Sequence, residues 1–238
     1  MKGFLLVFFC IISSAVFSQQ VVISDPNAVP KQVAPFTGIK VSGGITVYLS
    51  QSDNYSLAVS ANDTGFINDI KTEVKDNVLK ISTAPYHWKK HARNRELRVY
   101  ASFKTLDYID ASGACAVYVD GTINGNTVLI KLSGASTIEG KVNAGTISFS
   151  LSGASVANIS GNAENIKIEA SGASDIKNYD LKTQHCIAKL TGASDARLTI
   201  TNSLEVAASG ASTLYYNGNP DKKDIDKSGA SAVIQKQD

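Results

Sequence analysis

The sequence contains little of the side-chain chemistry on which many enzymes depend. Its 238 residues include only three histidines, three cysteines, one methionine and one tryptophan. No histidine recurs beside the many serines, so the pattern does not predict a Ser–His nucleophile. His87 and His91 have a spacing found in zinc sites, but no cysteine or further histidine lies near them in the sequence. The composition therefore predicts neither a bound metal nor another cofactor.

Net charge and long apolar runs are also scarce. The chain has 23 basic and 21 acidic residues, a formal charge of +2. This balance argues against a general nucleic-acid-binding protein and predicts no strong attraction to a membrane surface. Beyond the first 18 residues, no apolar run approaches the ~20 residues that a membrane-spanning helix needs. We therefore expect no transmembrane segment.

The first 18 residues have the pattern of a secretory signal. Lys2 precedes an apolar stretch from Phe4 to Ile12, and small residues lead up to Ser18. Cleavage before Gln19 is expected, which predicts a secreted protein of the periplasm or outer cell surface. A lipoprotein signal that uses Cys10 is the alternative, but bulky Phe9 stands where a small residue is preferred.

A four-residue phrase of the Ser-Gly-Ala-Ser type recurs seven times in the second half of the chain. Its first residues are separated by 21, 19, 19, 20, 18 and 19 positions, and such a regular period is typical of a solenoid. We call each phrase a corner. The corners begin at Ser112, Ser133, Ser152, Ser171, Thr191, Ser209 and Ser228.

The residues between corners alternate between apolar and polar, as a half-buried strand requires. The position five before a corner holds Val128, Ile147, Ile166, Cys186 and Leu204 in consecutive repeats. Lysine, serine and glutamate occupy many of the intervening positions. The pattern predicts an all-β fold, a right-handed parallel β-helix with rungs of about 19 residues stacked ~4.8 Å apart.

These corners resemble those of the putative auto-transporter adhesin, head GIN domain family of bacteria. The opening segment 36–47 (FTGIKVSGGITV) and the closing segment 214–220 (LYYNGNP) carry the same resemblance. The resemblance implies a secreted right-handed β-helix with a proposed role in adhesion and no established catalytic residues. It does not identify a ligand.

The domain organisation follows from where the corners begin. Residues 1–18 are the expected signal peptide and residues 19–35, with Pro26 and Pro30, a flexible lead-in. Residues 36–238 form a single predicted domain, with N-terminal strands and a cap at 36–105 and repeat rungs at 106–238. The cap strands are expected near 39–49, 56–60, 70–75, 78–82 and 96–103, with a hairpin turn at Asp76-Asn77. Lys223 and Lys227 interrupt apolar columns and predict a polar last rung.

The two cysteines of the predicted mature chain are expected to be free thiols. Cys115 and Cys186 are about four rungs apart, or ~19 Å, whereas α-carbons joined by a disulfide lie within ~7 Å. Cys186 falls in an inward column and should act there as a small apolar residue.

Three groups of residues are candidates for binding. The basic segment around Trp88, Lys89, Lys90 and Arg93 could hold an acidic sugar or phosphate by charge and stacking, or it could be a solvated loop. Tyr215 and Tyr216 could belong to a binding surface or to packing. A vertical line of corner serines is the remaining candidate, comprising Ser136, Ser155, Ser174, Ser194 and Ser212.

Asp175 and Asp195 occupy the same outward position in adjacent rungs. Such a pair could bind calcium or act on a glycoside, but Lys177 and Arg197 could equally neutralise the two carboxylates.

The leading functional interpretation is a non-enzymatic adhesion or surface-binding protein whose partner is a polysaccharide or an envelope protein. The alternative is a carbohydrate-active enzyme, a polysaccharide lyase or hydrolase, that uses Asp175 and Asp195. A third interpretation is a homo-oligomeric structural component, because Leu129 and Ile187 are apolar at outward positions.

Overall fold

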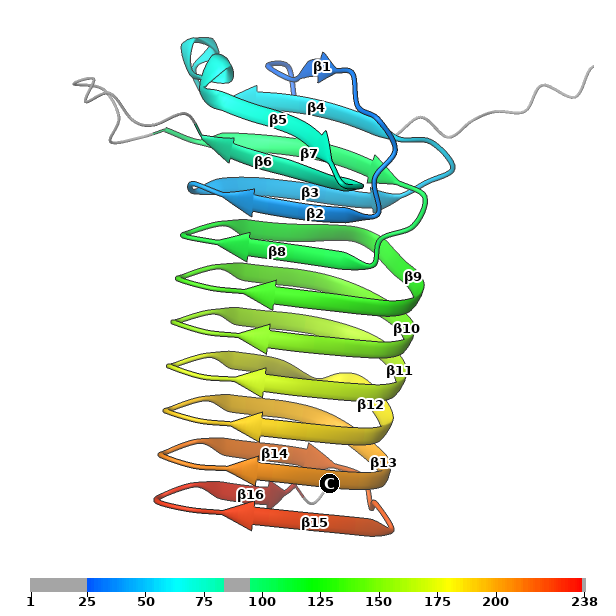
Figure 1. Cartoon of the computed structure of the whole chain (residues 1–238), viewed down its shortest axis with the longest axis vertical. Helices are drawn as coiled ribbons and strands as arrows, with labels where there is room; N and C mark the ends of the chain where they lie inside the picture. The colour runs from blue at the N-terminus through cyan, green and yellow to red at the C-terminus, as the bar shows by residue number, and fades with distance from the viewer. Residues whose placement is uncertain (1–24, 84–94, 237–238) are drawn as a thin grey trace, which may run out of the picture.

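The structure is a computed structural model that describes residues 25–83 and 95–236. Its centre is a stack of five long strands: β9 (Ala116–Leu132), β10 (Thr137–Leu151), β11 (Val156–Ala170), β12 (Asp175–Leu190) and β13 (Asp195–Ala208). Each strand pairs in parallel with the next, and each bends midway so that it runs along both broad sides of the stack (Figure 1). The predicted fold class, a parallel β-solenoid with rungs of about 19 residues, is confirmed.

The solenoid has two broad faces. The first, which we call the tyrosine face, contains β7 (Leu97–Phe103), β3 (Ile45–Gln51), the first halves of β9 to β13, β14 (Thr213–Asn217) and β16 (Ala232–Gln235). The second, the lysine face, contains β5 (Ile70–Lys75), β6 (Val78–Thr83), β2 (Gly38–Ser42), β8 (Tyr108–Ser112), the second halves of β9 to β13, and β15 (Lys222–Lys227).

The core is built from columns of like residues stacked across rungs. Val128, Ile147, Ile166, Cys186 and Leu204 are aligned by the strand register, and all five are buried. Burying each large apolar side chain stabilises the fold by roughly 1.5–3 kcal/mol. Because every rung adds to the same columns, the core is continuous along the stack.

The corners join the two faces at one edge of the stack. The amide of the corner alanine donates to the carbonyl of the glycine one rung earlier, for example Ala173 N to Gly153 O at 2.7 Å. The corner glycines have positive φ, +76° at Gly172, and a Cβ there would lie 2.6 Å from Gly153 O. The close stacking of backbone thus requires glycine.

The N-terminal strands add two further rungs and a cap. β2 and β3 form one rung, and β6 and β7 pair with them in parallel to form another. β4 (Ser56–Ala61) pairs antiparallel with β7, β1 (Val29–Lys31) pairs with β4, and the 3₁₀ helix η1 (Thr64–Asp69) follows β4. The antiparallel hairpin β5–β6 turns at Asp76 and Asn77, both with positive φ, as predicted.

The expected strand at 39–49 was wrong, because two strands occupy this region. β2 ends at Ser42 and β3 begins at Ile45, and Gly43 and Gly44 between them have φ of +93° and +72°. Ser42 aligns with Ser112, so 42–45 is a further corner with glycine in place of alanine.

The C-terminal end of the stack is polar. All six residues of β15 are exposed, and β15 pairs only with β13 in the described structure. Lys223 and Lys227 continue columns that contain Leu204 and Ala208 in the rung before. The β15 half of the last rung is therefore polar at every position except Ile225, while the β16 half keeps apolar residues such as Ile234.

Cys115 and Cys186 are free and buried. Within the described residues, no helix is long and apolar enough to cross a membrane.

Candidate functional site

The most conspicuous side chains on the tyrosine face are three stacked tyrosines. Tyr100, Tyr48 and Tyr118 lie on the neighbouring strands β7, β3 and β9 and are aligned by the strand register. The ring centroids of Tyr48 and Tyr100 are 5.1 Å apart, and those of Tyr48 and Tyr118 are 5.5 Å apart, with interplanar angles of 13° and 22°. We call this group the tyrosine stack.

The tyrosine stack is anchored by a hydrogen bond at one end and is open to solvent. Tyr48 is 37% and Tyr118 is 39% exposed. At the other end, the Tyr100 hydroxyl donates to Asp25 Oδ2 at 2.8 Å, and burial together with this hydrogen bond raises the pKa of Tyr100 to about 12. The stack is thus held at Tyr100 and exposed at Tyr118.

A shallow hollow of about 310 Å³ begins one rung beyond Tyr118. Glu139, the register partner of Tyr118, lines it together with Lys141 from the same strand. The remaining lining residues are Gly121, Gly140, Asn158, Ser160 and Asn178. We call this hollow the amide groove. Its lining pairs one carboxylate with one ammonium and is otherwise uncharged.

Hydrogen bonds hold part of the amide groove in place. Asn178 Nδ2 donates to Asn158 Oδ1 at 3.3 Å, and the amide of Asp180 donates to Asn178 Oδ1 at 2.9 Å. Gly140 has a φ of +154°, and a Cβ at this position would lie 2.5 Å from Val119 Cβ. The bend of β10 therefore needs glycine here.

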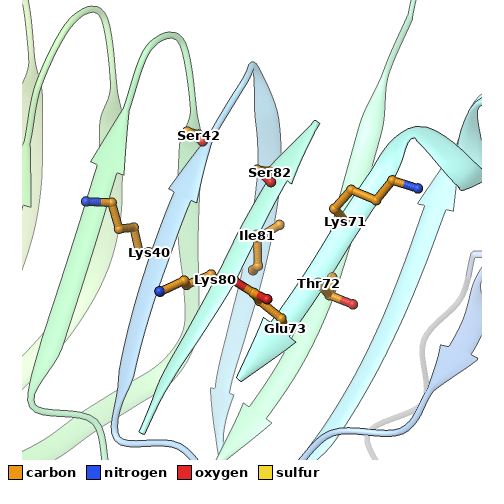
Figure 2. A pocket seen from close by; sticks show the side chains of 8 residues that line it. All are labelled: Lys40, Ser42, Lys71, Thr72, Glu73, Lys80, Ile81 and Ser82. Carbon is orange, nitrogen blue, oxygen red and sulfur yellow. The ribbon is translucent and has the colours of Figure 1, made fainter. Parts of the chain in front are cut away.

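A second hollow, of about 540 Å³, lies on the lysine face. Figure 2 shows its lining from β2, β5 and β6: Lys40, Ser42, Lys71, Thr72, Glu73, Lys80, Ile81 and Ser82. The lysines do not converge, because Lys40 and Lys80 extend toward one side and Lys71 toward the other. Lys40 also pairs with buried Asp110 at 3.0 Å. The hollow is positively charged at its rim but has no single focus for an anion.

The aspartates that the sequence singled out are brought together, with a cation between them. Asp175 and Asp195 are register partners on β12 and β13. Arg197 contacts Asp175 at 2.9 Å and Asp195 at 3.5 Å, and Lys177 approaches Asp175 at 3.6 Å. The guanidinium of Arg197 also lies over the Tyr215 ring, 5.1 Å from its centroid. Both carboxylates are therefore partly neutralised.

The described part of the chain contains no cluster of three His, Cys, Asp or Glu side chains suited to a metal ion.

The corner serines form the vertical line that the repeat predicts, but they point inward. All five are at most 1% exposed. Each hydroxyl donates to the carbonyl of the residue that opens its own corner, for example Ser174 Oγ to Ser171 O at 2.7 Å. The same bond recurs at Ser136, Ser155, Ser194 and Ser212. These serines hold the corners together, and their hydroxyls are not available to a surface ligand.

The other predicted residues are divided between the surface, the core and the undescribed segment. Ile187 is 48% exposed on the lysine face, Leu129 is half-buried there, and Tyr216 is buried. Trp88, Lys89, Lys90 and Arg93 lie outside the described residues.

The sequence interpretation missed the tyrosine stack, although a signal for it is present. The dipeptide Val-Tyr occurs at Val47-Tyr48, Val99-Tyr100 and Val117-Tyr118. Each valine is buried, which turns the adjacent tyrosine outward in a strand. Tyr48 is separated by 52 residues from Tyr100 and by 70 from Tyr118, and neither separation matches the repeat, so the sequence did not show that the three strands are neighbours.

Comparison with known proteins identifies relatives of this architecture. The model of the putative auto-transporter adhesin, head GIN domain, matches residues 35–220. A putative adhesin from Bacteroides fragilis superposes with a TM-score of 0.78 at 18% identity, covering 88% of this chain and 96% of that one. A putative adhesin from Parabacteroides distasonis gives a TM-score of 0.71 at 21% identity, with 87% and 95% covered.

A further P. distasonis structure, named a putative lipid binding protein, gives a TM-score of 0.62 at 18% identity, with 90% and 98% covered. At these identities the solved structures show a shared fold. No curated protein matches the chain significantly.

Proposed function

Because the chain belongs to the putative auto-transporter adhesin, head GIN domain family, we propose that it is a secreted, non-enzymatic protein that binds a molecule of the cell envelope. The partner is a polysaccharide or an envelope protein, and the location is the periplasm or the outer surface. The observation that carries the proposal is the tyrosine stack, an exposed aromatic surface on a rigid sheet. Tyrosine supplies a large contact area and loses little side-chain entropy on binding.

A solenoid suits this role because its surface is already ordered before a partner arrives. Each outward side chain is fixed by a paired strand, so binding has little backbone ordering to overcome. Rungs also repeat the same geometry along the stack, which allows a long partner to contact several rungs at once.

The proposal gives Asp175 and Asp195 no catalytic role. A glycosidase or lyase needs carboxylates free to take up a proton, a metal or a nucleophilic position. Here Arg197 contacts both groups and would have to be displaced first.

Binding and turnover together test the proposal. The purified chain should bind isolated envelope fractions or envelope polysaccharides in biolayer interferometry. It should release no product from a panel of uronic-acid polymers. Absence of binding to every envelope fraction would contradict the proposed function. So would polymer cleavage that disappears in an Asp175→Asn, Asp195→Asn double variant.

The proposal also includes the basic segment as a second contact, for acidic groups. Residues 84–94 connect β6 to β7, and the neighbouring strands β2 and β3 are joined by the Gly43-Gly44 corner. In the sequence, this connecting segment is longer than the Gly43-Gly44 link and is rich in basic residues. We expect a variant with four alanine substitutions to bind polygalacturonate more weakly, and the loss of affinity should be larger at low salt than at high salt. The substituted residues are Trp88, Lys89, Lys90 and Arg93. Equal affinity of the variant and the unmodified chain at low salt would remove this contact from the proposal.

A further inference from the structure

We infer that the Tyr118 end of the tyrosine stack and the adjoining amide groove form a binding site for a neutral glycan. This inference rests on the proposed binding function and names its ligand class and location. Four features support it: an exposed tyrosine, a polar groove next to it, the balanced charge of the groove, and a sheet with no open edge at this position.

Tyr118 presents a ring face toward the groove. Tyr48 is the middle ring of the stack, so one face of Tyr118 is covered by Tyr48. The other is directed toward β10, where the Glu139 side chain borders it as the register partner of Tyr118. Among the described residues, Tyr48 is the only ring or cation that contacts the Tyr118 ring. The C–H face of a pyranose ring carries partial positive charge and packs well on the negative face of an aromatic ring. Tyr118 can therefore support one sugar unit.

The amide groove supplies the hydrogen bonds that sugar hydroxyls require. Glu139 accepts hydrogen bonds and Lys141 donates them. The amides of Asn158 and Asn178 each have capacity beyond the bond they share, and Ser160 Oγ, which donates to Gly140 O at 3.4 Å, can still accept. Sugar hydroxyls are themselves both donors and acceptors, so this mixed lining matches them. Glu139 is the register partner of Tyr118, which places the groove directly beyond the ring.

The charge of the groove favours a neutral ligand over an acidic one. Its single carboxylate and single ammonium offset each other, so an anionic polymer gains no net attraction there. The 540 Å³ hollow on the lysine face is lined by three lysines and one glutamate, and it keeps a net positive charge after Lys40 pairs with Asp110, so an acidic ligand would be attracted there instead.

The sheet around the groove argues against an extended peptide as the ligand. β9, β10 and β11 each have a hydrogen-bonded neighbour on both sides of this face, apart from local register shifts. A peptide that binds by adding a strand needs a free edge, and none exists here. Recognition here therefore occurs through side chains on the face of the sheet, a mode that is open to a glycan.

The test is calorimetric titration of the full chain with two panels of oligosaccharides. The neutral panel contains β-1,4-glucan, β-1,3-glucan, β-1,4-xylan and β-1,4-mannan hexamers, and the acidic panel contains oligogalacturonate and heparin fragments. At least one neutral hexamer should bind. Tyr118→Ala should weaken that binding about tenfold, and Glu139→Gln at least threefold, because stacking and a charged hydrogen bond are lost.

Matched variants separate the site from general effects on folding. Tyr118→Phe keeps the ring and should bind within twofold of the unmodified chain. Tyr215→Ala removes another tyrosine of the same face, one that contacts Arg197 and lies several rungs away from Tyr118. Its affinity for the neutral hexamer should also stay within twofold of the unmodified chain. Urea unfolding of each variant shows whether any loss comes from instability, and a loss in Tyr118→Ala that Tyr118→Phe restores is specific to the ring.

Three results would overturn the inference. They are binding of the acidic panel alone, binding of no member of either panel, and neutral binding that Tyr118→Ala leaves intact. In each case the proposed function still stands if the chain binds envelope fractions, and it fails separately if no envelope fraction is bound.

Discussion

Space as well as backbone angle requires glycine at the second position of a corner. At Gly172 the φ of +76° already disfavours other residues, and a Cβ would also approach the Gly153 carbonyl oxygen to 2.6 Å. Gly121 on the tyrosine face has a similar φ of +81°, but a Cβ there would meet nothing within 4 Å. Comparing alanine substitutions at the two positions therefore separates the free-energy cost of the positive φ from that of the steric contact with the neighbouring backbone.

We expect Gly172→Ala to lower the free energy of unfolding by about 3 kcal/mol or more, and Gly121→Ala by about 1 kcal/mol. The difference arises because only Gly172 has backbone stacked against its Cα. Urea denaturation followed by circular dichroism measures both. Equal losses at the two positions would show that backbone contact between corners contributes little.

Burial also controls the titration of the cysteine thiols. Burial raises the pKa of Cys186 from 9.0 to about 12, and it raises the pKa of Cys115 as well. Between pH 9 and 12 the unfolded chain loses the Cys186 proton while the folded chain keeps it. The stabilisation is therefore complete below pH 9 and is lost as the pH rises through this window.

The expected loss from Cys186 is about 1 kcal/mol between pH 8 and pH 10. Cys186→Val should remove this part of the loss, since Val128 and Ile166 fill the same column in other rungs. Urea unfolding at the two pH values compares the chains. If the variant loses as much stability as the unmodified chain, the thiol titration does not contribute.

At the scale of single elements, β15 determines how the lysine face of the stack ends. The inward columns of β13 continue into β15 with Lys223 after Leu204 and Lys227 after Ala208. A free strand edge with an apolar surface would invite another copy to add further rungs. Two lysines at the inward positions oppose this, because stacking would desolvate their charges.

Lys223→Val together with Lys227→Val should therefore promote association through the C-terminal end. Light scattering across a concentration series should show a larger mean mass than for the unmodified chain. Lys222→Val, on the same strand at an outward position, is the matched control and should leave the mass unchanged. An unchanged mass in the double variant would show that other features protect the end.

Elements with a repeated pattern could be predicted from the sequence, and unique ones could not. The column of Val128, Ile147, Ile166, Cys186 and Leu204 was predicted because the same position recurs at a constant period. The corner at Gly43-Gly44 was not predicted, because glycine replaces alanine there and 70 residues separate Ser42 from Ser112. That interval contains β4, η1 and the β5–β6 hairpin, which interrupt the period.

The candidate site was less predictable than the fold, because part of it does not belong to the repeated pattern. Asp175 and Asp195 belong to adjacent repeats, so the period predicted that they lie close together. Neutralisation of the two carboxylates by Arg197 was one of the alternatives that the sequence offered. The tyrosine stack depends on the pairing of β3 with both β7 and β9, which joins segments outside the regular period. The inward direction of the corner serines depends on backbone geometry that the phrase alone does not specify.

At the scale of the whole molecule, stability should be a sum over rungs. Each long strand contacts mainly the rungs before and after it, so a complete rung can be removed without breaking the register of the others. Deleting Ser152–Ala170, one full repeat of 19 residues, joins Leu151 directly to the corner at Ser171.

This deletion should give a folded β-solenoid with lower stability, because one layer of the core is lost. Far-ultraviolet circular dichroism should retain the strand signal, and urea unfolding should shift to lower concentration. Deleting only 152–161 is the control, because it removes half a rung and turns inward residues outward. Loss of the strand signal in both chains would contradict the modular interpretation.

The two broad faces of the stack point away from each other, and they differ in chemistry. A partner docked over the tyrosines leaves the lysine hollow uncovered, and the reverse is equally true. Two separate macromolecules can thus be engaged at the same moment without competing. A slab with two such independent faces has the geometry of a cross-linker between two partners.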